Sequence, residues 1–303
     1  MRNKRQSNYN IYSGFSFFTP GIGGSAGLLG MFILGTILAA LLSSVFLLIS
    51  KAEIGMEFLQ FIMYPLSFIP AMIFASLQSK NNSFFSKGYK LDSNNFGHLG
   101  AFKAVLLAIV LALAGNFVLD ILGYVLPEMP EYLKEAMESL TGGNFFLDFI
   151  CVSIFAPFFE EWLCRGEILR GLLNYKRADG SRGIKPVWAI LLSAAIFAVI
   201  HGNIWQGLVA FLIGCLMGYV YYKTGSLKLT MIMHFVNNTM ALVFAQLDVF
   251  SDSEYFIDVM GAKWYWMAFA ACAIMIFLAI RCFSKIQCKD SQGNCDMVDP
   301  SEI

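Results

Sequence analysis

Three apolar stretches of this sequence each carry polar side chains of the types that enzymes use for hydrolysis. Carboxylates and imidazoles are common general bases, and amides donate hydrogen bonds to the oxyanion of a transition state. A centre built from such groups would activate a water molecule and stabilise the charge that develops. The candidate residues are Glu160, Glu161, Arg165, His201, His234 and Asn238.

The surroundings of these residues make them costly to keep. An ionisable side chain inside a bilayer costs about 2.5–3.5 kcal/mol on insertion scales, so it needs a partner or a purpose. Two of the three histidines of the chain stand in such apolar stretches. The third, His98, lies in a polar loop, and we expect no catalytic role for it.

Helical spacing separates the roles of the two neighbouring glutamates. Glu161 and Arg165 are four residues apart with the acid first, which is the favourable order for an ion pair on one helix face. Arg165 can therefore neutralise Glu161. Glu160 is rotated by about 100° around the helix axis, so it can face a different cavity. His234 and Asn238 are also four residues apart and share a face.

The distance along the chain predicts which side chains meet. Glu160 and His201 are equally far from the midpoint between Gly180 and Ser181, where an antiparallel hairpin would turn, so we expect them to lie at similar depth. Upright helices would place His201 about 10 Å or more further from the cytoplasmic side than His234. Helix tilt, or a 201–204 connection sunk into the membrane, must close that gap.

Other polar or small residues have structural interpretations. Asn237 is the competing amide on the third stretch. Asn116 and Asp120 lie toward the end of another apolar stretch, where we expect a structural or loop-anchoring role. Gly214 and Gly218 form a G-x-x-x-G pattern, which lets one helix approach another closely.

The composition indicates which elements must hold these residues. The chain has 303 residues, of which 57% are apolar and 14% charged, whereas an average soluble domain is about 25% charged. Mean hydropathy is +0.63. The formal net charge of +0 lacks the basic excess that nucleic-acid binding needs, so we exclude nucleic acid as a partner. The sequence therefore predicts an integral membrane protein.

The predicted fold is an all-α membrane protein with about eight transmembrane helices, since a bilayer core about 30 Å thick needs about 20 apolar residues of helix. These helices form one domain, residues 27–284. The polar tails on either side, 1–26 and 285–303, are expected to be flexible. The predicted spans are 27–50, 58–77, 104–126, 144–170, 186–201, 204–222, 229–247 and 264–282.

Lys and Arg residues predict the orientation, because cytoplasmic loops retain positive charge. With a cytoplasmic N-terminus, 17 of the 21 Lys and Arg residues fall on the cytoplasmic side, three fall outside, and Arg165 lies within a span. Both termini are then cytoplasmic, and a bacterial cytoplasmic membrane is favoured over the endoplasmic reticulum. The basic 171–186 loop lies on this side, so we expect water to reach the site from there.

The three motifs together resemble those of a known family. Glu-Glu-x-x-x-Arg, Phe-x-x-x-His and His-x-x-x-Asn, in this order on three of eight spans, are similar to the CPBP family of intramembrane proteases. That family comprises the type II CAAX prenyl endopeptidases and the bacterial Abi, or bacteriocin-processing, relatives. The resemblance covers the motif core, residues 144–247. It implies an endopeptidase that acts on membrane-associated or lipidated peptides and proteins.

The resemblance also implies a role for each candidate residue. Glu160 would be the base that activates a water molecule, which His201 would help to hold. His234 and Asn238 would stabilise the oxyanion. The pair of Glu161 and its arginine would order the site.

Two mechanisms remain open, because the family has been described both as metalloproteases and as glutamate-dependent enzymes without metal ligands. A zinc enzyme would use Glu160, His201 and His234 as ligands, with water in the fourth position. No H-E-x-x-H helix in the sequence supports this version. We favour the metal-free mechanism and expect no cofactor, with zinc as the alternative.

Two further classes of function are kept as alternatives. A non-catalytic membrane scaffold or bacteriocin-immunity protein would retain the fold and bind a partner, but no motif residue is lost in this chain. A small-solute transporter also uses buried Glu, Arg and His side chains, although no inverted repeat relates the two halves here. The expected partners are membrane lipid and a peptide or protein substrate, and no oligomeric state is predicted.

Overall fold

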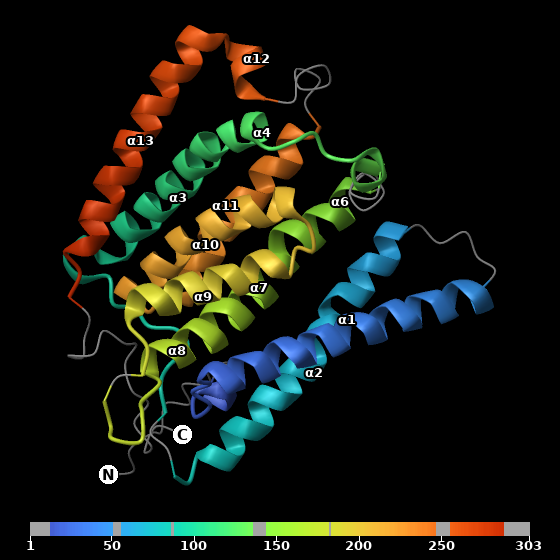
Figure 1. Cartoon of the computed structure of the whole chain (residues 1–303), viewed down its shortest axis with the longest axis vertical. Coiled ribbons are helices and arrows are strands. Elements are labelled where there is room, and N and C mark those ends of the chain that lie inside the picture. Colours follow the sequence, from blue (N-terminus) through green and yellow to red (C-terminus); the bar gives the residue numbers. More distant parts are fainter. Residues whose placement is uncertain are drawn as a thin grey trace, which may run out of the picture.

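The structure, a computed structural model, consists of helices joined by connections, with no β-strand among the described residues (Figure 1). The described residues are 13–50, 56–85, 88–135, 144–181, 183–246 and 255–287. The helices are α1 Ile22–Ser50, α2 Met56–Asn82, α3 Gly100–Leu119, α4 Ile121–Val125, α6 Phe145–Asp148, α7 Ala156–Glu161, α8 Arg170–Asn174, α9 Pro186–Val199, α10 Ile204–Thr224, α11 Leu227–Phe244, α12 Phe256–Met260 and α13 Ala262–Ser284.

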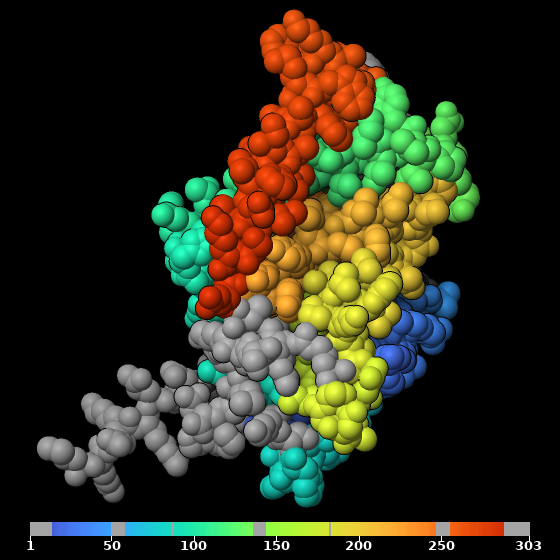
Figure 2. Space-filling model, turned by 60° about the vertical axis from the view of Figure 1, so that its left-hand side comes forward, coloured from blue at the N-terminus to red at the C-terminus, as the bar shows by residue number. Residues whose placement is uncertain are grey.

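Six of the described helical segments are long and apolar enough to cross a membrane. They correspond to predicted spans one, two, three, six, seven and eight. For example, α13 runs along the surface of the molecule with few buried side chains, as a helix facing lipid would (Figure 2). The other two predicted spans fall on the charged helical segment 145–174 and on α9, which has 14 residues. The chain is a membrane protein that is all-helical over its described residues, and both the count of eight spans and the orientation stay predictions.

Segment 145–174, called the glutamate helix below, is an unbroken helix of mixed geometry. It consists of α6, α7 and α8, joined by π-helical stretches at Phe149–Phe155 and Trp162–Leu169. Pro157 lies at the start of α7, directly after the first π-helical stretch, and it has no N–H group to donate to the turn before it. π-Helical turns recur at functional sites. Here they lie on both sides of the two glutamates.

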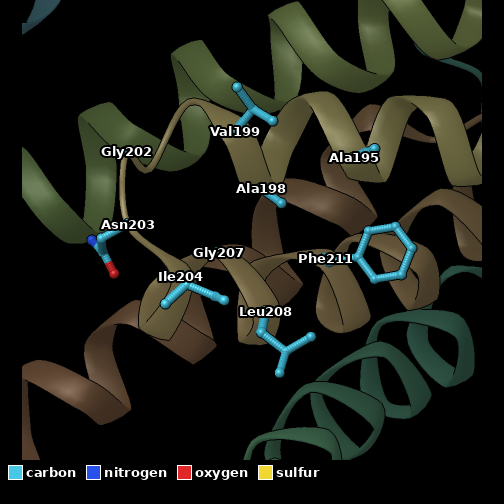
Figure 3. A pocket seen from close by; sticks show the side chains of 9 residues that line it. All are labelled: Ala195, Ala198, Val199, Gly202, Asn203, Ile204, Gly207, Leu208 and Phe211. Carbon is cyan, nitrogen blue, oxygen red and sulfur yellow. The ribbon is translucent and has the colours of Figure 1, made fainter. Parts of the chain in front are cut away.

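The α9–α10 hairpin packs closely because α10 presents glycines to α9. A side chain at Gly214 would meet Ala194 and Phe197, and Gly218 approaches α9 one turn further on. The G-x-x-x-G pattern therefore has the packing role that the sequence predicts. The connection between the two helices turns at Gly202, where a φ of +71° favours glycine (Figure 3).

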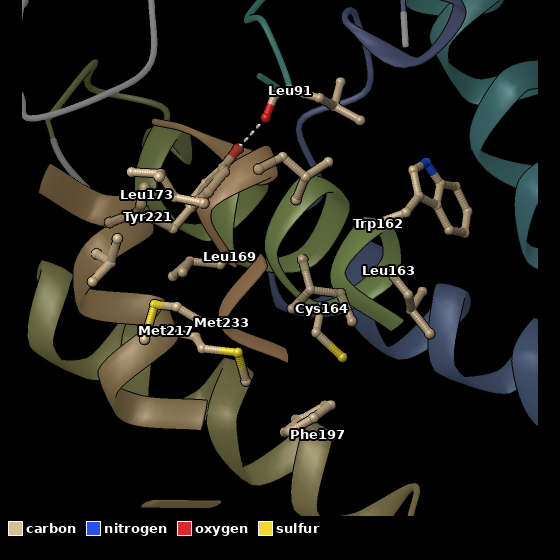
Figure 4. Close-up of a cluster of buried hydrophobic side chains, with 14 of the residues drawn as sticks. Leu91, Trp162, Leu163, Cys164, Leu169, Leu173, Phe197, Met217, Tyr221 and Met233 are labelled. Carbon is tan, nitrogen blue, oxygen red and sulfur yellow. Dashed lines mark hydrogen bonds between the residues drawn. The ribbon is translucent and has the colours of Figure 1, made fainter. Parts of the chain in front are cut away.

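The apolar core lies where the glutamate helix meets α9, α10 and α11 (Figure 4). Close packing of such side chains supplies the dispersion energy that holds helices together in lipid. A hydroxyl within this core is satisfied, because Tyr221 donates a hydrogen bond to the backbone carbonyl of Leu91 at 2.8 Å. The buried side chains include Trp162, Leu163, Leu169, Phe197, Met217 and Met233.

A buried arginine fastens the segment before α1 to the glutamate helix. Arg170 falls among the cytoplasmic positive charges of the sequence-based topology, but its side chain is 0% exposed. A guanidinium group can serve many acceptors because it has five N–H donors. It also pairs with Glu167, whose carboxylate lies 3.3 Å away. The backbone carbonyls that accept its hydrogen bonds are those of Phe15, Ser16, Phe18, Tyr89 and Gly166.

The described parts of the two predicted tails, 1–26 and 285–303, are packed against the bundle. Phe17 and Phe18 are buried, and α1 begins before the predicted start of the first span. At the other end Ile286 is 1% exposed. Burial of these apolar side chains is more favourable in free energy than their exposure to water would be in a flexible tail. Residues 1–12 and 288–303 lie outside the described residues.

Replacing Arg170 by Met should destabilise the fold. The substitution leaves the carboxylate of Glu167 buried without its partner, and removing one member of a buried ion pair costs about 3–5 kcal/mol. We expect a clear decrease of the thermal unfolding temperature in detergent. Arg177→Met, at an exposed loop position, should leave that temperature unchanged. Equal unfolding temperatures for the two variants would contradict the role of Arg170.

Candidate active site

Four of the six candidate residues line one cavity of about 650 Å³. Its walls come from α2, the glutamate helix, the α9–α10 connection, α10 and α11, and most of the side chains on them are apolar. This volume lies within the range of about 300–1,000 Å³ that is usual for ligand pockets. The four residues on its walls are Glu160, His201, His234 and Asn238.

The other two candidates form an ion pair behind the cavity wall. Nη1 of Arg165 lies 2.7 Å from Oε1 of Glu161, and both side chains are 0% exposed. The same carboxylate oxygen lies 3.0 Å from Nδ1 of His234. Nη2 of Arg165 donates to the backbone carbonyl of Gly214 at 3.2 Å. The pair predicted from the i, i+4 spacing therefore forms, and it links the glutamate helix to α10 and α11.

Glu160 occupies a different environment from its neighbour, as the helical rotation predicts. Its side chain is 13% exposed. Oε1 accepts a hydrogen bond from the hydroxyl of Tyr64 at 2.6 Å. Oε2 has no hydrogen-bond partner among the described residues and lies 3.8 Å from Nε2 of His234. One carboxylate oxygen is thus held by Tyr64, and the other is buried without a hydrogen-bond partner among the described residues.

His201 lies in the connection after α9 rather than within a helix. Its Nδ1 lies 2.7 Å from the backbone carbonyl of Phe197, so Nδ1 carries the proton and Nε2 is left for another partner. The predicted meeting of His201 with Glu160 takes the form of a shared cavity, since no hydrogen bond joins these two described side chains.

The ring of Phe197 bridges the expected gap in depth between the two histidines. It packs edge to face against His201, with ring centroids 5.0 Å apart, and against His234 at 5.4 Å. The guanidinium of Arg165 lies over the same ring at 4.3 Å from its centroid, which adds a cation–π contact. One aromatic side chain therefore sets the spacing of three candidate residues.

A chain of amides holds Asn238 in place. Asn238 donates from Nδ2 to the backbone carbonyl of Val152 at 2.8 Å, and its Oδ1 accepts from Nδ2 of Asn237 at 3.1 Å. Asn116 in turn donates to Oδ1 of Asn237 at 2.9 Å. The structural role expected for Asn116 is confirmed. Asp120 anchors a loop, as expected, by accepting from the backbone at the start of α12.

Two contributors to the site are not predicted from the sequence. Tyr64 lies on α2, far outside the three motifs. Phe61, Tyr64 and Phe68 recur at helical spacing and so share one face of α2. This aromatic face is the sequence signal that could have indicated Tyr64 as a contributor to the site. Phe197 is part of the Phe-x-x-x-His motif, but the motif alone gives its ring no task. Both act by contact with residues distant in the sequence.

A second pocket, of about 560 Å³, lies at the α9–α10 connection (Figure 3). Its lining is apolar except for Asn203, and none of its lining side chains can titrate. Hydrolytic chemistry therefore belongs to the cavity that holds Glu160.

The cavity lies toward the end of the bundle opposite to the basic loop. Met129 follows α4, Trp205 begins α10 and Ala245 ends α11, whereas the loop joins α8 to the first residue of α9 (Figure 1). The expectation that water enters from the side of the 171–186 loop gains no support from this lining. In the orientation that Lys and Arg predict, these residues lie in the half of the membrane away from the cytoplasm.

The arrangement of Glu160, His201 and His234 tests whether these side chains could bind a metal ion together. Each imidazole has its Nδ1 held by an oxygen atom, an arrangement that metal-binding histidines share. However, the described part of the chain contains no group of three His, Cys, Asp or Glu side chains that could hold a metal ion. Glu160, His201 and His234 as they stand therefore do not form the three-ligand set of a zinc enzyme.

Comparison with known proteins identifies the segment that carries the site. Residues 142–240 match the family described as Type II CAAX prenyl endopeptidase Rce1-like. The motif core resembles this protease family. The predicted resemblance is thereby confirmed over about a third of the chain, including all six candidate residues, and it supports a hydrolase of the protease class. A search of curated proteins and a search of solved structures each found no match.

The buried ion pair gives a stability prediction. Arg165→Met should destabilise the protein by about 3–5 kcal/mol, because Glu161 would keep a buried charge without the guanidinium. The double variant Glu161→Gln with Arg165→Met removes both charges and should recover most of the loss. Thermal unfolding in detergent measures both effects. A double variant no more stable than Arg165→Met alone would show that the pair does not have this role.

Proposed function

We propose that the protein is an intramembrane endopeptidase that hydrolyses peptide bonds with a water molecule activated by Glu160. One observation carries the proposal. Glu160 lines the cavity, and its Oε2 is buried, has no hydrogen-bond partner among the described residues, and lies 3.8 Å from Nε2 of His234. A water molecule that entered the cavity and bound beside these two groups would have a proton acceptor next to it.

The proposed reaction follows from that placement. Glu160 takes a proton from the water as the water oxygen attacks the carbonyl carbon of the substrate. The new C–O bond produces a tetrahedral oxyanion, and the C–N bond then breaks. Glu160 returns the proton to the leaving nitrogen, which regenerates the carboxylate. General base catalysis of this kind contributes about 10²–10⁴-fold to the rate.

The two histidines and the amide have distinct proposed roles. His201 has its Nδ1 proton on the carbonyl of Phe197, so its Nε2 can accept a hydrogen bond and orient the water. His234, with Nδ1 toward Glu161, would donate from Nε2 to the oxyanion when both ring nitrogens carry protons. Asn238 uses one amide hydrogen on a backbone carbonyl, and its second can reach the oxyanion.

The ion pair has a positioning role in this proposal. Glu161 fixes which nitrogen of His234 faces the cavity, and Arg165 keeps Glu161 charged in a place that water does not reach. Because both side chains are 0% exposed, they act through His234 and not on the substrate.

The substrate class follows from the walls of the cavity and from the family. Mostly apolar walls suit an apolar peptide segment that approaches from the membrane. The family adds lipidated peptides to this class. We propose further that both termini are cytoplasmic in a bacterial membrane, which the distribution of Lys and Arg favours.

Glu160→Gln should lower turnover by about 10²-fold or more, because an amide of the same shape cannot accept the proton of the water. The assay uses purified protein in detergent with fluorogenic apolar peptides, and in parallel a peptide with a prenylated cysteine. His201→Ala should also abolish cleavage.

The matched control is Glu131→Gln, at an exposed helical position outside the cavity lining, which should keep full activity. All variants should unfold at the same temperature as the unaltered protein. Full turnover in both Glu160→Gln and His201→Ala would contradict the catalytic assignment. It would leave the scaffold and transporter alternatives.

The metal-free mechanism gives a separate prediction. Dialysis against a strong chelator should leave the rate of peptide cleavage unchanged, because no step above uses a metal ion. The control is the same dialysis without chelator. Loss of turnover that added Zn²⁺ restores would overturn this mechanism in favour of a zinc enzyme.

A further inference from the structure

We infer that Tyr64 is a positioning residue for Glu160, and that its hydroxyl selects which carboxylate oxygen takes the proton from water. The inference rests on the function proposed above. Tyr64 lies on α2, outside residues 142–240 that match the protease family. Its hydroxyl donates to Oε1 of Glu160 at 2.6 Å. No sequence motif brings these two residues together.

The two oxygens of the carboxylate have different surroundings. Oε1 is engaged in a short hydrogen bond of the charge-assisted kind, which is about twice as strong as one between neutral groups. Oε2 has no such partner among the described residues and lies 3.8 Å from Nε2 of His234, which lines the same cavity. A carboxylate is planar, so holding Oε1 also fixes the direction of Oε2. Tyr64 thereby keeps the basic oxygen aimed at the place where the water would bind.

The position of the hydroxyl is itself fixed by aromatic packing on both sides of Tyr64 along α2. Phe61 of α2 packs on Phe155, with ring centroids 5.3 Å apart. One turn beyond Tyr64, Phe68 stacks on Phe159 at 5.2 Å. These two contacts dock α2 onto the glutamate helix at Phe155 and at Phe159, the residue directly before Glu160. Tyr64 is therefore held on a rigid element, as an effective positioning group must be.

The contact could instead be only a tie between two helices, and the two roles have different consequences. A tie would contribute to stability and leave the chemistry of a correctly folded molecule unchanged. A positioning residue would affect the chemical step and leave the binding of substrate unchanged. The kinetic constants kcat and KM separate these cases, provided that unfolding is measured on the same samples.

The test is Tyr64→Phe, which keeps the ring and removes the hydroxyl. We expect kcat to fall by about 10–100-fold, and KM to stay within about twofold, because misplacing a general base affects the transition state more than binding. The control is Tyr124→Phe. Tyr124 donates to Asp258 at the same distance of 2.6 Å, but outside the cavity. This control should keep full kcat.

Three outcomes would be informative. A kcat of Tyr64→Phe within about twofold of the unaltered protein, with Glu160→Gln inactive, overturns the inference and spares the proposed function. A lower unfolding temperature than that of Tyr124→Phe, with kcat unchanged per folded molecule, shows a structural tie and also overturns it. Full activity of Glu160→Gln removes the proposed function itself.

Discussion

The buried ion pair of Glu161 and Arg165 is the constraint on which the rest of the site depends. Two charges removed from water cost several kcal/mol each unless they are paired and their other hydrogen-bonding groups are satisfied. The pair meets part of this demand by reaching three other helices, through His234, the carbonyl of Gly214 and the ring of Phe197. Oε2 of Glu161 and Nε of Arg165 have no hydrogen-bond partner among the described residues. A side chain at position 214 would approach the guanidinium to 3.1 Å. The absence of a side chain at Gly214 therefore leaves the space that the guanidinium of Arg165 occupies.

The same physics explains why two adjacent glutamates can do different work. Glu161 points into the packed interior, where its carboxylate has a guanidinium and an imidazole beside it. Glu160 points into the cavity and has only the hydroxyl of Tyr64 on one oxygen. A carboxylate oxygen with no partner is costly in an apolar environment. Each glutamate has one such oxygen, but Oε1 of Glu161 has two partners and Oε1 of Glu160 has one. The glutamate with fewer partners is the one that lines the cavity.

Much of the site was predictable because it rests on local spacing. The pairing of Glu161 with Arg165 follows from i, i+4 geometry, and so does the close approach of α10 through its glycines. The hydrogen bond from Tyr64 joins residues 96 positions apart, and the one from Asn116 to Asn237 spans 121. Contacts of this kind depend on how helices tilt and dock, which a periodic pattern does not determine. The π-helical stretches and the packing of residues 13–20 fall in the same class.

The hydrogen-bonded series of asparagines leaves one amide hydrogen of Asn238 as a donor, which complements the acceptor that Glu160 provides. In lipid a polar group must find its partners within the protein, and amides on facing helices do so by donating and accepting in turn. Asn116, Asn237 and Asn238 form such a series, which ends on the carbonyl of Val152. An amide nitrogen has two hydrogens, so the last member retains one at the cavity wall. Hydrolysis of a peptide bond needs an acceptor for the proton of water and a donor for the oxyanion. Among the residues that line the cavity, Glu160 can serve as such an acceptor and Asn238 as such a donor, and each is held by its own hydrogen bonds.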